Sequence, residues 1–246
     1  MNNNPDILVV DISSNQIIYG LGGYNKPSGF MNRPDNINID LILDKIILEL
    51  NLKNPDIYLS HIYNQKFLSD KYKLKYYNRH TLSLLSICKN TGLVIDFNNN
   101  HTKILPIYSG LLLDSYIKYS NISLNKFTNL EKKQITELIT DPVKYHLDCI
   151  PLHESIILCI KSLPIDLRKS ILQNILIVGD QKITGIKIPD TLIKNIRKSY
   201  NPNYNMNINS PKTKIIQSWI GGSIMSITQN NSKVNTSKHS NSTNIA

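Results

Sequence analysis

The segment Ile7-Leu-Val-Val-Asp-Ile12 is a short apolar run with one acidic residue near its end. The polar residues Ser13-Ser14-Asn15 follow it, and Gln16–Leu21 is a second run that suits a strand. Two such runs separated by a short polar turn are typical of a β-hairpin. The sequence therefore predicts a buried strand that ends in an acid and pairs with the strand that follows it.

The same pattern occurs a second time. Leu93–Asp96 is an apolar run ending in an acid, Phe97–His101 is a turn, and Thr102–Tyr108 suits a return strand. Between the two hairpins, Ile37–Leu50 has apolar residues at helical spacing. Because strand and helix patterns alternate, we predict an α/β fold, and the repeated hairpin suggests an internal duplication.

Composition excludes several classes of protein. The chain has 246 residues, is 41% hydrophobic and carries a formal net charge of +10. Heavy use of Asn, Ile and Lys, whose codons are AT-rich, weakens the charge as a sign of a nucleic-acid partner. The apolar runs are shorter than the ~20 residues of a membrane span, so no membrane partner is expected. Three cysteines at unrelated spacings favour reduced thiols.

The two acids that end the hairpins are the candidate chemistry. Asp11 and Asp96 could hold a hydrated Mg²⁺ against a nucleotide phosphate, with backbone N–H groups from the turn at Ser13 and Ser14. The second turn is poorer, since we expect Phe97 to place bulk where a phosphate would approach. The alternative is that both acids only end strands and satisfy turn amides.

Other motifs indicate no catalytic or metal site. His153-Glu154 has no partner at ligand spacing, and Gly20-Leu-Gly-Gly23 lacks the spacing of a dinucleotide loop. The basic and tyrosine-rich run Lys71–Tyr77 could stack on RNA, but the same alternation also suits the edge of a surface strand or helix. Residues 228–246 are Ser, Asn, Thr and Lys with few core formers, which predicts a disordered polar tail.

The segments described above resemble the actin superfamily. Val9-Val-Asp11 with Ser13 and Gly20 is similar to its first phosphate hairpin, and Thr91–Asp96 with Pro106-Ile-Tyr-Ser-Gly110 is similar to its second. Ser218-Trp-Ile-Gly-Gly-Ser-Ile224 is the most specific match. The resemblance implies two RNase H-like domains facing a cleft, the first at 1–91 completed by 212–227, and the second at 92–211.

Departures from the actin pattern predict that this member is not catalytic. Ile18 stands at the position of a phosphate-binding lysine, and Arg79 aligns with the glutamine that positions water. Only Gly179 survives from the double glycine of the adenine region. The chain is also short, which implies that the upper-lobe insertions (subdomains 2 and 4) are reduced or missing after residues 22–36 and between Tyr119 and Pro151. We expect no cofactor, although the resemblance leaves ATP with Mg²⁺ as a vestigial ligand of Asp11, Ser13, Ser14, Asp96 and Gly179.

Short segments near Ser162–Arg168 and Tyr116–Ser120 are similar to the divergent fungal actin-related proteins at the pointed end of dynactin (the actin-related protein ten type). This resemblance implies a non-catalytic subunit of the cytoplasm and cytoskeleton. Its expected partners are the actin-related filament protein of dynactin and other dynactin subunits, with a role in dynein-driven motility on microtubules. The matching filament-contact residues are Tyr108, Ser109, Gly110, Leu163, Pro164, Ile165 and Asp166. The alternatives are an actin-fold subunit of a nuclear chromatin-remodelling complex and a degenerate nucleotide-binding protein.

Overall fold

The computed structural model of the chain describes residues 6–13, 15–61, 67–179, 186, 188–201, 203 and 205–240. It divides into two compact units, one formed by Met1–Ser86 with Ser218–Ala246 and the other by Ile87–Gln217. The first unit is thus discontinuous in sequence, and the boundaries lie a few residues from those expected at 91/92 and 211/212.

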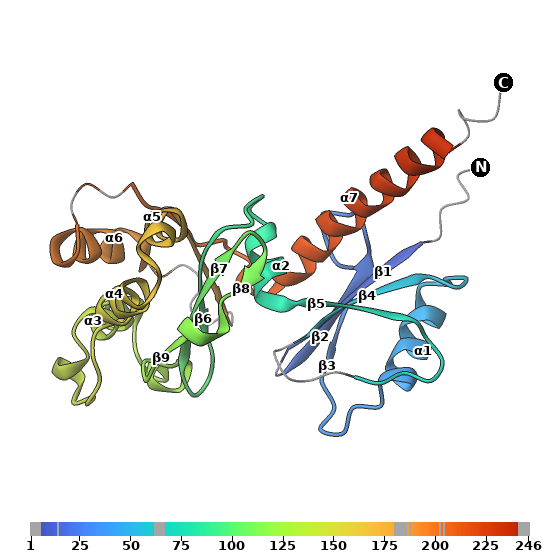
Figure 1. Cartoon of the computed structure of the whole chain (residues 1–246). Coiled ribbons are helices and arrows are strands. Elements are labelled where there is room, and N and C mark those ends of the chain that lie inside the picture. The colour runs from blue at the N-terminus through green and yellow to red at the C-terminus, as the bar shows by residue number, and fades with distance from the viewer. Residues whose placement is uncertain are drawn as a thin grey trace. The chain divides into compact units, whose positions relative to one another are not determined.

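The first unit is built on a five-stranded sheet with the order β3-β2-β1-β4-β5 (Figure 1). The two hairpin strands β1 (Ile7–Ile12) and β2 (Gln16–Leu21) pair antiparallel and have the predicted bounds. On the far side of β2, β3 (Gly29–Asn32) pairs antiparallel. On the far side of β1, β4 (Asp56–His61) and β5 (Leu74–Asn78) continue the sheet in parallel.

Alternation along β1 sends its side chains to two different layers. Leu8, Val10 and Ile12 pack in a hydrophobic cluster with α1 (Ile39–Glu49), whose first turn is capped by the Asn38 side chain. Since neighbouring residues of a strand point to opposite faces, Val9 and Asp11 face away from that cluster. That second face receives α2 (Arg79–Leu85) and the long helix α7 (Gln217–Ser240).

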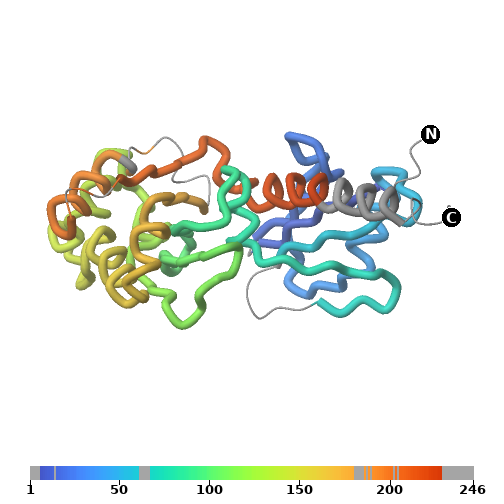
Figure 2. The backbone as a smooth tube through the Cα atoms, turned by 45° about the horizontal axis from the view of Figure 1, so that its top comes forward, coloured from blue at the N-terminus to red at the C-terminus, as the bar shows by residue number. Residues whose placement is uncertain are grey.

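Helix α7 packs closely against β1 and α2 because two of its residues lack side chains. A Cβ on Gly221 would lie 1.7 Å from the carbonyl oxygen of Leu82, and one on Gly222 would lie 2.7 Å from Val9. Next to them, the fully buried Trp219 donates from Nε1 to the carbonyl of Val9 at 3.2 Å. Figure 2 shows this helix lying along the first strands, although some 200 residues separate them in sequence.

The second unit repeats the strand order and directions of the first. The hairpin β6 (Gly92–Phe97) and β7 (Thr102–Tyr108) is followed by β8 (Leu111–Leu112), while β10 (Asn174–Gly179) and β11 (Asn207–Asn209) lie parallel on the other side of β6. A short strand, β9 (Lys118–Ser120), also pairs with β7. The duplication suggested by the two hairpins is therefore present in the topology, as expected for two related α/β domains.

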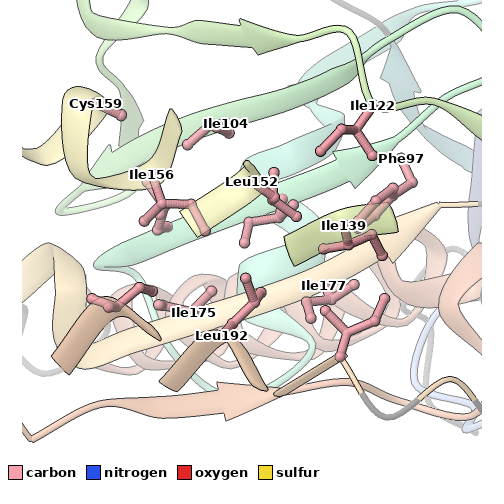
Figure 3. Close-up of a cluster of buried hydrophobic side chains, with 14 of the residues drawn as sticks. Phe97, Ile104, Ile122, Ile139, Leu152, Ile156, Cys159, Ile175, Ile177 and Leu192 are labelled. Atoms are coloured by element: carbon pink, nitrogen blue, oxygen red, sulfur yellow. The ribbon is translucent and has the colours of Figure 1, made fainter. Parts of the chain in front are cut away.

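Helices α3 to α6 contribute to the hydrophobic core of the second unit. These are α3 (Lys132–Thr140), α4 (Leu152–Ser162), α5 (Ile165–Gln173) and α6 (Ile188–Ser199). Figure 3 shows the buried side chains between them and the sheet, including Phe97, Ile139, Leu152 and Ile177. Among the described residues, no helix is both long and apolar enough to cross a lipid bilayer.

Three segments differ from what the sequence predicts. The edge strands β3 and β11 were not predicted, because polar and glycine residues hide a strand pattern of only three or four residues. Helix α7 continues to Ser240, through much of the predicted disordered tail. No Pro or Gly follows Gly222 in it, so a helix already started at Gln217 can propagate at little cost per residue. Residues 241–246 of the predicted tail lie outside the described part of the chain.

The connections expected to be reduced are short. Between β3 and α1 the chain runs only from Arg33 to Asn38. Between α3 and α4 it runs from Asp141 to Pro151 and forms a single 3₁₀ turn, η3 (Pro142–Tyr145). Part of the stretch between Tyr119 and Pro151 is nevertheless kept, because α3 and the 3₁₀ turn η2 (Leu124–Phe127) supply core residues of the second unit.

Candidate functional site

Asp11 is completely buried, and both of its carboxylate oxygens are already engaged inside the first unit. The hydroxyl of Ser60 on β4 donates to Oδ1, and the hydroxyl of Ser218 on α7 donates to Oδ2. The Nε of Arg79 lies 3.2 Å from Oδ1 and also 3.4 Å from the Ser218 hydroxyl. The carboxylate is therefore held by two hydroxyls and one guanidinium.

Local structure places Arg79 in this network. Asn78 caps α2, with its side-chain oxygen accepting from the backbone N–H of His80 and Thr81, so Arg79 is the first residue of the helix. Only 15% of the Arg79 side chain is exposed. A guanidinium is always charged in proteins, and it offers a fork of donors to a carboxylate. The Arg79 charge thus compensates the buried charge of Asp11.

The first hairpin turn uses its own hydrogen-bonding groups. The backbone N–H of Ser13 donates to the carbonyl of Gln16 at 2.9 Å, and the Ser13 hydroxyl donates to the same carbonyl at 2.8 Å. Arg33 donates to the carbonyl of Ser13 at 3.1 Å. Ser13 therefore has a structural role in the turn. Ser14, the other predicted phosphate ligand of this turn, lies outside the described residues.

The second hairpin corrects our expectation for Phe97. Its ring is buried in the core of the second unit, 6.0 Å from the ring of Phe127, so it does not place bulk in the turn (Figure 3). The turn itself is fixed by the carbonyls of Asn98 and Asn99, which accept from the N–H groups of Leu124 and Asn125. Phe97 is therefore the last residue of β6 and a core residue, not part of the turn.

Gly179 and Asp96 also have local explanations in the second unit. Gly179 has φ +135°, and a Cβ there would lie 2.5 Å from the carbonyl oxygen of Phe97. A glycine is thus required by the close approach of β10 to β6. Asp96 is almost fully buried and lies opposite Lys103 in the register of β6 and β7.

The residues around Asp11 do not fit a site for Mg²⁺ and nucleotide. Mg²⁺ binds through carboxylate oxygens and water, but the Asp11 oxygens accept from Ser60, Ser218 and Arg79. The strand neighbour of Asp11 in the hairpin is Ile18, which is fully buried and offers no donor. No group of three or more His, Cys, Asp or Glu side chains in the described part of the chain could hold a metal ion.

Comparison with protein families agrees with this architecture. The family model for Actin matches residues 134–241, from within α3 to the end of α7, including the Trp219 motif and its two glycines. This part of the chain is similar to the actin family. A search of curated proteins gave no match.

In this actin-like fold, the segment at the start of α5 presents three of its four predicted contact residues. Pro164, Ile165 and Asp166 are exposed, and Ile165 is 78% exposed. Leu163 is the exception, because it is only 1% exposed and belongs to the core cluster of the second unit. Its side chain is therefore excluded from a contact face. The prediction missed this because an apolar residue beside a proline suits an interface and a core equally.

Two hydrogen bonds hold the start of α5 rigidly. Arg168 donates from Nε to the carbonyl of Leu163 at 2.9 Å and from Nη2 to the carbonyl of Lys161 at 2.7 Å. These bonds fix the turn between α4 and α5 that carries Ile165. Helix α5 packs against β6 and β7.

The turn after β7 carries the other predicted contact residues. Tyr108 and Ser109 are exposed, and Ser109 and Gly110 both have positive φ, at 49° and 81°. The N–H of Gly110 donates to the carbonyl of Asn90 at 2.7 Å, and that of Ser109 donates to the Thr91 hydroxyl at 3.0 Å. The turn is thus a fixed feature, and exposed Leu111 extends it.

Proposed function

We propose that this protein is a non-catalytic actin-fold subunit that ends a short actin-related filament, at the pointed end of the dynactin filament. It would act in the cytoplasm as part of the cytoskeleton, with the dynactin filament protein and other dynactin subunits as partners. The observation that carries the proposal is the short connection at each place where the actin resemblance implies an upper lobe, Arg33–Asn38 and Asp141–Pro151.

A filament grows because each subunit offers one surface to the subunit before it and a different surface to the subunit after it. A subunit that keeps one of these surfaces and lacks the other binds once and stops growth. Exposed Tyr108, Ile165 and Leu111 supply apolar area of the kind found at protein interfaces. The reduced connections supply little on which a further subunit could sit.

A structural role rather than ATP hydrolysis is supported by the network around Asp11. Phosphoryl transfer requires metal and charge stabilisation at the phosphates, and Asp11 is already occupied by Arg79 and two hydroxyls. We expect Mg-ATP to give no heat of binding in calorimetry and to leave the thermal unfolding of the protein unchanged. Binding at micromolar or tighter affinity would contradict this part of the proposal.

The first test of the proposal is a tagged purification of the full chain from its native cells, followed by mass spectrometry. Recovery of the dynactin filament protein with its other subunits would support the proposal. Recovery of chromatin-remodelling ATPases and histones instead would overturn it in favour of a nuclear role.

The contact face is tested by Ile165→Asp, with Val143→Asp as the matched control. Both residues are apolar, highly exposed and in the second unit, at 78% and 71% exposure. In a pull-down with the dynactin filament protein, Ile165→Asp should weaken binding about tenfold or more, the size of effect seen at interface centres. Val143→Asp should leave it unchanged. Equal loss in both variants, or loss in neither, would reject the start of α5 as the contact face.

A further inference from the structure

A groove on the first unit is lined by three lysines and an apolar floor, and it shares no residue with the network around Asp11. Its volume is about 590 Å³, and we call it the lysine groove. The residues that line it come from α1, from the loop that follows α1 and from the segment just before β5: Ile47, Leu52, Lys53, Asn54, Pro55, Lys71, Tyr72 and Lys73. A second hollow of about 380 Å³ shares four of these residues and adds Leu48, so the surface continues along α1.

The groove arises from how the chain leaves α1 and enters β5. After α1, Asn51 and Asn54 adopt positive φ and turn the chain back, which brings Lys53 to the rim. Parallel strands such as β4 and β5 are usually joined through a helix that covers the sheet. Residues 67–73, the described part of this connection, contain no helix. Ile47 and Leu52 are therefore only partly covered.

The charges in the groove are unbalanced. Lys71 is 2.5 Å from Asp44, and the hydroxyl of Tyr72 also donates to that carboxylate, so Asp44 is neutralised. Lys53 and Lys73 are exposed, and neither forms an ion pair with a described residue. Two positive charges therefore border an apolar floor with no ion pair to any residue that the structure describes. Leu48, 82% exposed, lies at the adjoining end.

We propose that the lysine groove binds an acidic, amphipathic peptide segment of a partner protein. Its apolar side chains would cover Ile47, Leu52 and Leu48, and its carboxylates would pair with Lys53 and Lys73. Charge complementarity of this kind sets the choice of partner and the rate of encounter. The apolar floor allows apolar side chains of the peptide to be buried, which a binding surface made only of charges would not allow.

The tyrosines of the Lys71–Tyr77 run argue for a peptide over RNA. Stacking on bases requires free aromatic faces. The side chains of Tyr72 and Tyr76 pack against the hydrophobic cluster of the first unit, and the ring of Tyr77 lies 5.2 Å from the ring of Tyr58. Strand β5 is an edge of the sheet, and its one lysine, Lys75, is paired with Asp56.

The test measures fluorescence polarisation of a labelled peptide of alternating Leu and Glu with the full-length protein. Lys53→Glu with Lys73→Glu should weaken its binding about tenfold or more, since two attractive contacts become repulsive. Lys132→Glu with Lys133→Glu is the matched control, because it makes the same change in net charge on exposed residues of α3. The control should leave the affinity within about twofold.

Two further measurements separate the apolar and the charged contributions to peptide binding. Leu48→Ser should weaken binding of the peptide severalfold, and a peptide with Gln in place of Glu should also bind more weakly than the Glu peptide. Equal loss in the two lysine variants would mean that only bulk charge attracts the peptide, and would overturn the proposal. The proposal would also be overturned if the peptide did not bind. It would likewise be overturned if single-stranded RNA bound instead and Lys53→Glu with Lys73→Glu abolished that binding.

Discussion

Replacing Arg79 by Met should destabilise the first unit strongly, because it removes the only cation within ion-pair distance of Asp11 among the described residues. Met keeps most of the apolar stem and removes the charge. At an effective dielectric constant of about 20, charges 3.2 Å apart attract by about 5 kcal/mol. The two hydroxyls that remain on Asp11 offset part of this loss. We expect a fall of about 3 kcal/mol in the free energy of unfolding, at the lower end of the range for broken buried pairs.

A double-mutant cycle isolates the pair. Asp11→Asn alone should cost about 2 kcal/mol, less than Arg79→Met, because the stranded Arg79 has some contact with water while the stranded Asp11 has none. The double variant carries no buried charge, so its cost should be well below the sum of the two single costs. We expect a coupling free energy of about 2 kcal/mol.

The assay is urea unfolding followed by the fluorescence of Trp219, the single tryptophan of the chain. Trp219 is buried in the first unit beside Ser218, so its signal reports the unit in which the pair lies. Lys71→Met is the control, since it breaks an exposed pair in the same unit and should leave the midpoint unchanged. Single costs that add to within about 0.5 kcal/mol would refute the idea that Arg79 compensates Asp11.

Three further predictions concern packing and pH. Leu163→Asp should unfold the second unit at room temperature, because it buries an unpaired charge. Ile165→Asp, two residues further on, should leave the circular dichroism melt unchanged. Similar melts for the two variants would contradict the buried position of Leu163. Gly221→Ala should cost about 3 kcal/mol or more by Trp219 fluorescence, since its Cβ would overlap the Leu82 carbonyl, and Gly110→Ala, where space is open, should cost only about 1 kcal/mol in a melt of the second unit. Burial lowers the pKa of His153, whose Nδ1 has no hydrogen-bond partner among the described residues, so the neutral form is favoured in the fold. The contribution of neutral His153 to stability is complete above the unfolded pKa of about 6.5 and is lost as the pH falls below that value. In urea titrations, His153→Leu should therefore flatten the decline of stability between pH 7 and about 5.5. An unchanged decline would mean that another group causes it.

The sequence predicted the elements whose pattern is long and apolar. The hairpin strands β1, β2 and β7 have the predicted bounds, and α1 begins only two residues later than the helical spacing suggested. Each of these elements has a face that must be buried, so the spacing of its apolar residues indicates a strand or a helix. Short edge strands carry no such period, since β3 and β11 are only four and three residues long and are held by hydrogen bonds to β2 and β10.

The partners of the candidate site residues could not be predicted. Arg79 was noticed as a departure from the actin pattern, but its pairing with Asp11 depends on β1 and α2 lying side by side. Ser218 is 207 residues from Asp11, and nothing in its own segment signals that its hydroxyl will reach a carboxylate. Phe97 likewise looked like an obstacle in a turn, because the sequence does not say which way a residue at a strand end points.

The discontinuous first unit has a consequence for how the protein is made. Strands β1 and β2 leave the ribosome early, but the helix that covers Val9 and completes the network at Asp11 is translated only after the whole second unit. During synthesis one apolar face of the first sheet is therefore exposed, and Asp11 still lacks the hydroxyl of Ser218 as a hydrogen-bond donor. The second unit, which is continuous in sequence, can fold in that interval. Newly made chains are thus most prone to aggregate while residue 218 is still to come, and a stall in translation there would leave half of the protein folded and half exposed.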